Sequence, residues 1–217
     1  MKQVQEVKLT TADPSGIGLF GLALVTLVAS TQKLGWTDGL GFVIPWAIFL
    51  GGLMQLYASM LDAKLGNTFG ATAFGAYGFF WLAVGASWMT QAGVFGAELA
   101  SQVDGKQLGV AFLGYLAFTI FMTIGALETN KVLFSIFFLI NFLFLGLGLS
   151  NLGILEGFMH EMAAIAELLI GILSVYGAGA NVLNKHFGFS FLPIGKPFGI
   201  IGKNRPQEDE SSQHASH

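Results

Sequence analysis

Six apolar runs, each about as long as a bilayer is thick, limit what this chain can fold into more than any other feature of its sequence. They cover approximately residues 15–33, 39–61, 70–90, 108–126, 132–152 and 162–183. A helix needs about 20 apolar residues to cross the hydrocarbon core of a membrane. The runs therefore predict an all-α integral membrane protein, folded as a six-transmembrane-helix bundle.

The composition supports a lipid environment and excludes several functions. Hydrophobic residues make up 53% of the chain and charged residues 11%, against about 25% charged residues in soluble proteins. The 30 Gly and 21 Phe residues suit close helix packing in lipid. A net charge of -3 does not suggest a nucleic-acid partner. The absence of Cys from the sequence excludes disulfides, thiolate metal sites and a cysteine nucleophile, and we expect no cofactor or metal.

The runs divide the chain into three parts. Residues 1–12 form a polar N-terminal segment, residues 13–195 a six-helix transmembrane domain, and residues 196–217 an acidic, Ser- and His-containing tail that we expect to be solvated. The first run has no small-residue cleavage site, so we do not interpret it as a signal peptide.

The distribution of Lys and Arg predicts the topology. An even number of spans places both termini on one side of the membrane, and cytoplasmic loops carry an excess of positive charge. The side of the termini holds Lys2, Lys8, Lys64, Lys131, Lys185, Lys196, Lys203 and Arg205, and the other side Lys33 and Lys106. We therefore expect a multi-pass protein of the cell membrane with both termini in the cytoplasm.

Ionisable residues inside a span are costly and indicate function. Glu167 lies within the last run, near its outer end. Two interpretations stay open: a carboxylate that reaches the membrane interface, or a group that couples transport to protons. Asp62 and Lys64 lie at the end of a run, where we expect lipid headgroups and water to solvate them.

Neutral polar residues within the runs are candidates for a pathway lining, although each could instead bond a neighbouring helix. They are Thr26, Gln55, Tyr57, Tyr77, Asn141, Asn151, Ser174 and Asn181. Amide and hydroxyl donors can hold a carboxylate without the tight binding that Arg would give. We expect Gln55, Tyr77 and Asn151 to contact a substrate, with Thr26 as a further candidate.

Four residues on four different runs lie at a common depth. Leu22, Gln55, Tyr77 and Ile140 are each six to eight residues from the ends of their runs on the side of the termini. At about 1.5 Å per residue this is roughly 9–12 Å into the membrane. Every helix has residues at this depth, so depth alone leaves open whether the four face one another.

Enzyme motifs are absent from the sequence. It contains no HExxH, P-loop, GxSxG or paired-carboxylate pattern, and we expect no enzyme. Small-xxx-small pairs such as Ala71/Gly75 and Ser174/Ala178 indicate close helix packing, within a subunit or between subunits.

Three segments carry a family resemblance. The segment DPSGIGLFGL at 13–22 resembles the N-P-x-P-L-G-L opening of the acetate uptake transporter family, the YaaH-like succinate–acetate permeases of bacteria and their yeast relatives. The segment GGLMQLYASMLDAKLGNTFGATAFGAYGFFWL at 51–82 is more similar still, and VLNKHFG followed by LPIG, within 182–195, resembles the C-terminal ending.

The resemblance implies a six-helix protomer in a homohexamer that moves acetate and similar small monocarboxylates, either with protons or as a channel. It places a narrow apolar constriction on Leu22, Tyr77 and Ile140. Two departures stand out: bacterial relatives have Phe at the position of Leu22, and the Asn and second Pro of the opening motif are Asp13 and Gly16 here. A competing interpretation is a membrane scaffold or sensor that transports nothing.

Overall fold

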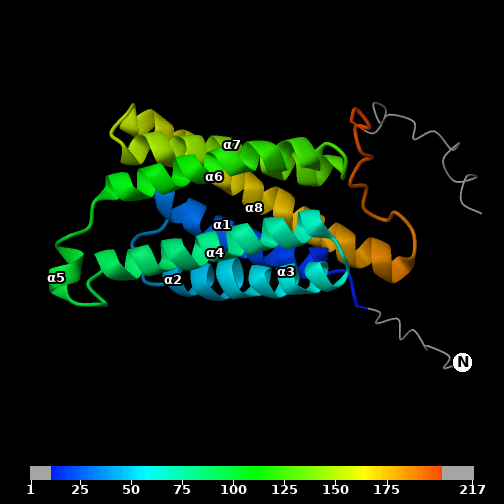
Figure 1. Ribbon diagram of the computed structural model, residues 1–217, viewed down its shortest axis with the longest axis horizontal. Coiled ribbons are helices and arrows are strands. Elements are labelled where there is room, and N and C mark those ends of the chain that lie inside the picture. The colour runs from blue at the N-terminus through cyan, green and yellow to red at the C-terminus, as the bar shows by residue number, and fades with distance from the viewer. Residues whose placement is uncertain (1–10, 202–217) are drawn as a thin grey trace, which may run out of the picture.

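The computed structural model describes residues 11–201, which form a bundle of long helices that run along one common axis (Figure 1). Six helices are long and apolar enough to cross a membrane. They are α1 (Ser15–Lys33), the continuous α2 (Val43–Trp46), η1 (Ala47–Met54) and α3 (Gln55–Lys64), then α4 (Thr68–Gln91), α6 (Gly105–Ala126), α7 (Lys131–Asn151) and α8 (Glu156–Phe187). The short helix α5 (Ala97–Ala100) lies in the α4–α6 connection. Residues 11–201 contain no strand, and the prediction of a six-helix membrane bundle is confirmed.

Two spans begin elsewhere than expected. The last helix starts at Glu156, although its apolar run starts only at about residue 162, because polar residues continue the helix beyond the hydrophobic stretch. The second span starts at Val43 and not at residue 39, since Gly39 has a φ of +74° and lies in the connection before the helix. Hydropathy therefore located the spans but not their polar ends.

The second span contains a π-helix, η1, that brings α1 unusually close. A Cβ atom on Gly21 would lie 2.5 Å from the carbonyl oxygen of Leu50, so only glycine permits this approach of α1 to η1. Gln55 is the first residue after the π-turns. Such widened turns occur frequently at functional sites, and this one places Gln55 toward the interior of the bundle.

Short polar residues start the helices that follow the turns. The side chains of Asn67, Asp104 and Asn130 accept hydrogen bonds from backbone N–H groups in the first turns of α4, α6 and α7. Each cap satisfies a donor that would otherwise have no partner. These residues explain why the apolar runs are interrupted at these positions.

Some of the small-residue pairs pack helices within the protomer. The Ser59 hydroxyl of α3 donates to the carbonyl of Ala71 on α4 at 2.7 Å, and a Cβ atom on Gly75 would lie 3.0 Å from the Ser59 oxygen. The Ala71/Gly75 pair therefore packs α4 against α3, as small-residue pairs do in membranes.

The C-terminal segment 188–201 folds back across one end of the bundle, the end at which the described chain also begins (Figure 1). The Asn184 side chain donates to the carbonyl of Leu192 and accepts from its N–H, both at 2.8 Å. Val132 N–H donates to the carbonyl of Ile194, and Phe198 N–H to that of Leu127. The C-terminal segment, which includes the LPIG part of the family resemblance, thus connects α8 to the turn between α6 and α7. The basic residues Lys2, Lys8, Lys203 and Arg205, and most of the expected tail, lie outside the described residues.

Candidate functional site

A cavity enters the bundle from the end at which the described residues 11–201 begin and end, and we call it the proximal cavity. Its volume is about 330 Å³. Polar residues surround its mouth, among them Asp13, Asp62, Asn67, Asn130 and Asn181. Deeper in the bundle its walls include Leu22, Gln55, Tyr77 and Ile140. The four residues that share one predicted depth therefore line one space.

A larger cavity enters from the opposite end, and we call it the distal cavity. Its volume is about 1020 Å³. Its mouth holds polar and charged residues, including Gln32, Gln91, Lys106, Asn151, Glu156, His160 and Glu161. Apolar residues, including Phe80, Trp81 and Leu143, form its inner wall.

The two cavities approach within one helical turn of each other. On α4 the proximal cavity reaches Tyr77 and the distal cavity reaches Phe80, and on α7 the corresponding residues are Ile140 and Leu143. Three residues correspond to about 4.5 Å along a helix. The barrier that separates the two cavities is therefore about one side chain thick at these helices.

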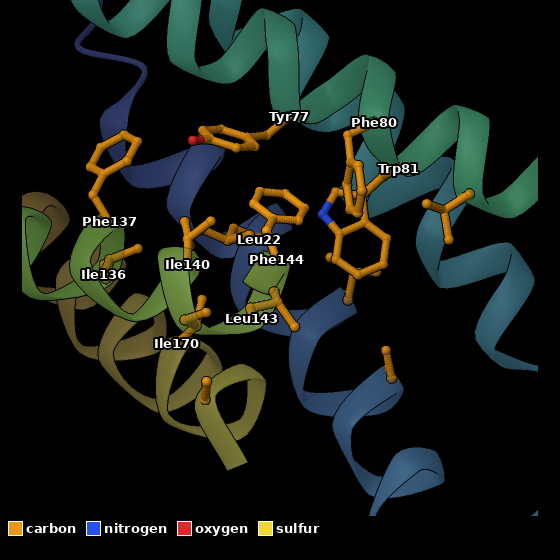
Figure 2. Packing of buried hydrophobic residues seen from close by; sticks show 14 of the residues in the cluster. Leu22, Tyr77, Phe80, Trp81, Ile136, Phe137, Ile140, Leu143, Phe144 and Ile170 are labelled. Carbon is orange, nitrogen blue, oxygen red and sulfur yellow. The ribbon is translucent and has the colours of Figure 1, made fainter. Parts of the chain in front are cut away.

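Leu22, Tyr77 and Ile140 form the proximal face of this barrier. They come from α1, α4 and α7, and their side chains point toward one another (Figure 2). Each is buried, with exposed fractions of 8%, 5% and 4%. The helices thus bring these three residues together at the position that the resemblance implied for a constriction.

Phe144 adds an aromatic layer that the sequence interpretation missed. Its ring stacks on Tyr77 with centroids 6.2 Å apart, and its edge meets Phe80 at 5.0 Å (Figure 2). Phe144 is 1% exposed. The available signal was its spacing of four residues from Ile140, which places both on one face of α7.

The Tyr77 hydroxyl is already bonded to the protein. It lies 2.9 Å from the hydroxyl of Thr119 on α6. Thr119 donates its own proton to the carbonyl of Tyr115 at 2.7 Å, so Tyr77 is the donor and Thr119 the acceptor. In this structure the phenol proton is therefore bonded to α6.

Gln55 keeps donor capacity at the proximal cavity. Its Nε2 donates to the carbonyl of Gly51 at 2.8 Å, and its side chain is 1% exposed. An amide nitrogen carries two N–H groups, and this bond uses one of them. Gln55 can therefore donate a further hydrogen bond to an anion in the cavity.

The other expected contacts lie apart from Gln55 and Tyr77. Asn151 lines the distal cavity and donates to the carbonyl of Leu147 in its own helix. Thr26 is not among the described residues that line either cavity, and its hydroxyl bonds the carbonyls of Leu22 and Ala23. Tyr57, a candidate for the pathway lining, is 50% exposed and is not among the described residues that line either cavity.

Two carboxylates are more buried than expected. Asp62 is 2% exposed, because Asn67 bonds one of its oxygens and the start of α4 covers it. The expectation that this carboxylate is solvated at a helix end is therefore wrong. Glu167 is 1% exposed and pairs with Lys33 at 2.9 Å. Glu167 lies about 16 Å along α8 from the start of this helix at Glu156.

Asp13 lies at the mouth of the proximal cavity. Its carboxylate accepts a hydrogen bond from the N–H of Ser15 and lies 3.1 Å from Lys185 Nζ. Partial burial raises the pKa of Asp13, but the hydrogen bonds with Ser15 and the nearby Lys185 outweigh it and leave the pKa below its ordinary value.

Comparison with known proteins identifies relatives along most of the chain. The Succinate-acetate/proton symporter SatP of Escherichia coli (strain K12) is 36% identical over 186 residues, which cover 85% of this chain and 96% of that protein. The Ammonia transport outward protein 2 of Saccharomyces cerevisiae is 31% identical over 198 residues, 89% of this chain and 68% of that one.

A solved structure shares the fold. The structure described as that of the bacterial acetate channel SatP matches with a TM-score of 0.80 and 33% identity, covering 86% of this chain and 100% of that one. The family model described as the GPR1/FUN34/yaaH family matches residues 2–196. The chain therefore belongs to the GPR1/FUN34/yaaH family of membrane proteins.

Proposed function

We propose that this protein carries acetate and similar small monocarboxylates across the cell membrane through the proximal cavity, the barrier and the distal cavity. The observation that carries the proposal is the approach of two cavities from opposite ends to within one helical turn, at Tyr77/Phe80 and Ile140/Leu143. The names of the bacterial relatives, an acetate channel and a succinate-acetate/proton symporter, support the substrate class. They also support a transport role and not an enzymatic one.

The chemistry of the pathway suits a small organic anion. A carboxyl group titrates near 4.3 in a model peptide, so acetate is mostly ionised at neutral pH and must lose water at an apolar constriction. Gln55, next to the barrier, can replace part of that water with an amide N–H. Asn151 provides a corresponding amide in the distal cavity. The proposed contacts thus lie on both sides of the barrier. Tyr77 contributes its ring to the barrier itself.

The distribution of charge supports an orientation with both termini in the cytoplasm. Among the described lysines, Lys64, Lys131, Lys185 and Lys196 belong to the end that the proximal cavity enters, and Lys33 and Lys106 to the other. Positive residues favour the cytoplasmic side. Cleavage of a protease site added to either terminus, in sealed cells and in inverted vesicles, tests this orientation.

We further propose that the protein assembles as a homohexamer in which every protomer has its own pathway. The resemblance to the family and the abundance of small residues on the helices support this assembly. The mass of the protein in nanodiscs tests it. A monomer that still transports acetate would contradict the proposal.

Uptake of labelled acetate into proteoliposomes tests the function. We expect saturable acetate uptake above that of protein-free vesicles, and no comparable uptake of labelled methylammonium. The name of the yeast relative makes ammonia transport the second candidate function, which methylammonium uptake without acetate uptake would support. Uptake of neither compound would favour a scaffold or sensor.

A further inference from the structure

A buried ion pair lies in the wall of the distal cavity, apart from the barrier. Lys33 is the last residue of α1 and Glu167 lies on α8, and their Nζ and Oε2 atoms are 2.9 Å apart. The side chains are 10% and 1% exposed, and both residues line the cavity. The Lys33 ammonium also lies 5.8 Å from the centre of the Trp88 ring. A cation and a carboxylate are thus held together beside the space that a substrate would enter.

We propose that Lys33 is a carboxylate-binding site of the distal cavity, and that Glu167 occupies this site until an incoming acid gives its proton to Glu167 and its carboxylate to Lys33. The inference rests on the proposed function, because the ligand is the transported monocarboxylate. Glu167 itself shows that the site fits such a group, since its carboxylate is the same head group that acetate carries.

The exchange conserves atoms and charge. The O–H bond of acetic acid breaks, an O–H bond forms on the Glu167 carboxylate, and the acetate anion replaces Glu167 beside Lys33 Nζ. The pair holds one cation and one anion before and after the exchange. When the ion enters instead of the acid, one proton from solution is taken up with it.

Burial makes it unfavourable for the ion pair to bind a proton alone or a carboxylate alone. A proton on Glu167 without an anion would leave the Lys33 ammonium buried and unpaired, and an anion without a proton would place two carboxylates beside one ammonium. Unpaired or excess charge in a buried site carries a large desolvation cost. Proton and carboxylate should therefore bind together.

Other charged or titratable residues line the same cavity and are considered in the test. Lys106 comes from α6, and Glu156, His160 and Glu161 come from α8. The cavity-lining residues on α4 and α7 near the pair, including Trp88, Gln91, Ser150 and Asn151, are not charged. His160 precedes Glu167 by seven residues, about two turns on the same face of α8, so a His160→Gln variant separates its contribution from that of Glu167.

Proton uptake on ligand binding tests the proposal directly. Sodium acetate is added to purified protein in weakly buffered detergent solution at neutral pH, and protons taken up and labelled acetate bound are both measured. We expect about one proton per acetate in the wild type and in His160→Gln. In Glu167→Gln we expect acetate to bind without proton uptake, and in Lys33→Gln a roughly tenfold or larger loss of affinity. The control substitutions Lys64→Gln and Glu98→Gln, at positions that line neither cavity among the described residues, should change neither quantity.

Several results would overturn the proposal. They are acetate binding to the wild type without protons, unchanged proton uptake in Glu167→Gln, or unchanged affinity in Lys33→Gln. Equal proton uptake with sodium chloride would make the site a general anion site and overturn the carboxylate assignment. A wild type that transports acetate but fails this test leaves the proposed function standing, whereas a wild type that transports none contradicts the function itself.

A measurement on the unmodified protein covers the case in which these variants do not fold. Infrared difference spectra with ¹³C-labelled acetate separate the bands of the ligand from those of the protein. We expect acetate to convert a protein carboxylate band into a protonated carboxyl band. A spectrum without this conversion would overturn the proposal.

Discussion

The hydroxyl of Tyr77 donates to the hydroxyl of Thr119, 2.9 Å away on α6, because Thr119 donates its own proton to the carbonyl of Tyr115. Thr119 of α6 therefore holds in place the phenol ring that forms one side of the barrier. Its ring faces Leu22 and Ile140, and its hydroxyl faces a neighbouring helix (Figure 2).

This bond predicts that Tyr77→Phe and Thr119→Val act through the same interaction. Each should cost about 1 kcal/mol of stability, as for a typical hydrogen bond, and the double variant should be little worse than either single one. The same pattern should hold for the acetate uptake rate. The measurement is a double-mutant cycle on thermal unfolding and uptake. A loss of uptake in Tyr77→Phe far beyond that in Thr119→Val would instead show that the hydroxyl contacts acetate.

The size of the barrier residues should set the size of the substrate. Ile140→Ala should speed lactate relative to acetate, because it removes bulk from the proximal face, at a cost of about 2 kcal/mol in stability. Leu22→Phe should narrow the range of acid sizes that pass, because it adds bulk to the barrier. The observable is the acetate-to-lactate ratio of uptake rates in folded protein. A ratio unchanged by both substitutions would place the constriction elsewhere.

Gln55 should provide the hydrogen bond that replaces water at the barrier. Gln55→Leu removes this donor at nearly constant volume, and hydrogen bonds to charged groups are worth about 1.5–3 kcal/mol. We therefore expect the KM for acetate to rise roughly tenfold or more. Because the substitution also removes the bond to Gly51, unfolding is measured in parallel. Wild-type KM in folded Gln55→Leu would remove this residue from the site.

The Asp13–Lys185 pair should stabilise the protein only where Asp13 is ionised. Its pKa in the folded protein is lowered, so the contribution is present above the pKa of the unfolded chain and is lost as the pH falls through the lowered value. Asp13→Asn keeps a side-chain acceptor for Ser15 and loses the charge. It should cost about 0.2–1 kcal/mol at neutral pH and nothing in strong acid. Unfolding curves at both pH values check this, and an equal cost at both would assign the effect to packing.

The fold could be predicted from the sequence because one requirement dominates it. A helix that crosses lipid must be apolar over about 20 residues, and this signal is local and strong. Depth counting found Leu22, Gln55, Tyr77 and Ile140 because the rise per residue is fixed. It could not show which helices face each other, which depends on close contacts such as that of Gly21 with Leu50.

The missed features depend on contacts between distant segments. Glu167 was open to interpretation as an interface residue because its partner, Lys33, is 134 residues away in the chain. Phe144 was one of many Phe residues in an apolar run, and its role depends on the positions of Tyr77 and Phe80. The bond that occupies the Tyr77 hydroxyl depends on Thr119 of another helix. Only Phe144 has a pattern in the sequence, its four-residue spacing from Ile140, and the contacts of Glu167 and Tyr77 produce none.

We propose that substrate passes through the proximal cavity, and the absence of cysteine from the sequence allows a direct test of this path. Ala73, on α4, lines this cavity, and Ser101 is exposed near α5 at the other end of the bundle. Single-cysteine variants Ala73→Cys and Ser101→Cys are reconstituted and treated on both membrane faces with a cationic methanethiosulfonate reagent. Mass spectrometry measures the extent of modification, and labelled acetate measures uptake. We predict that modification at position 73 abolishes acetate uptake while equal modification at position 101 leaves it intact. Full modification at position 73 with unchanged uptake would show that acetate does not pass through the proximal cavity.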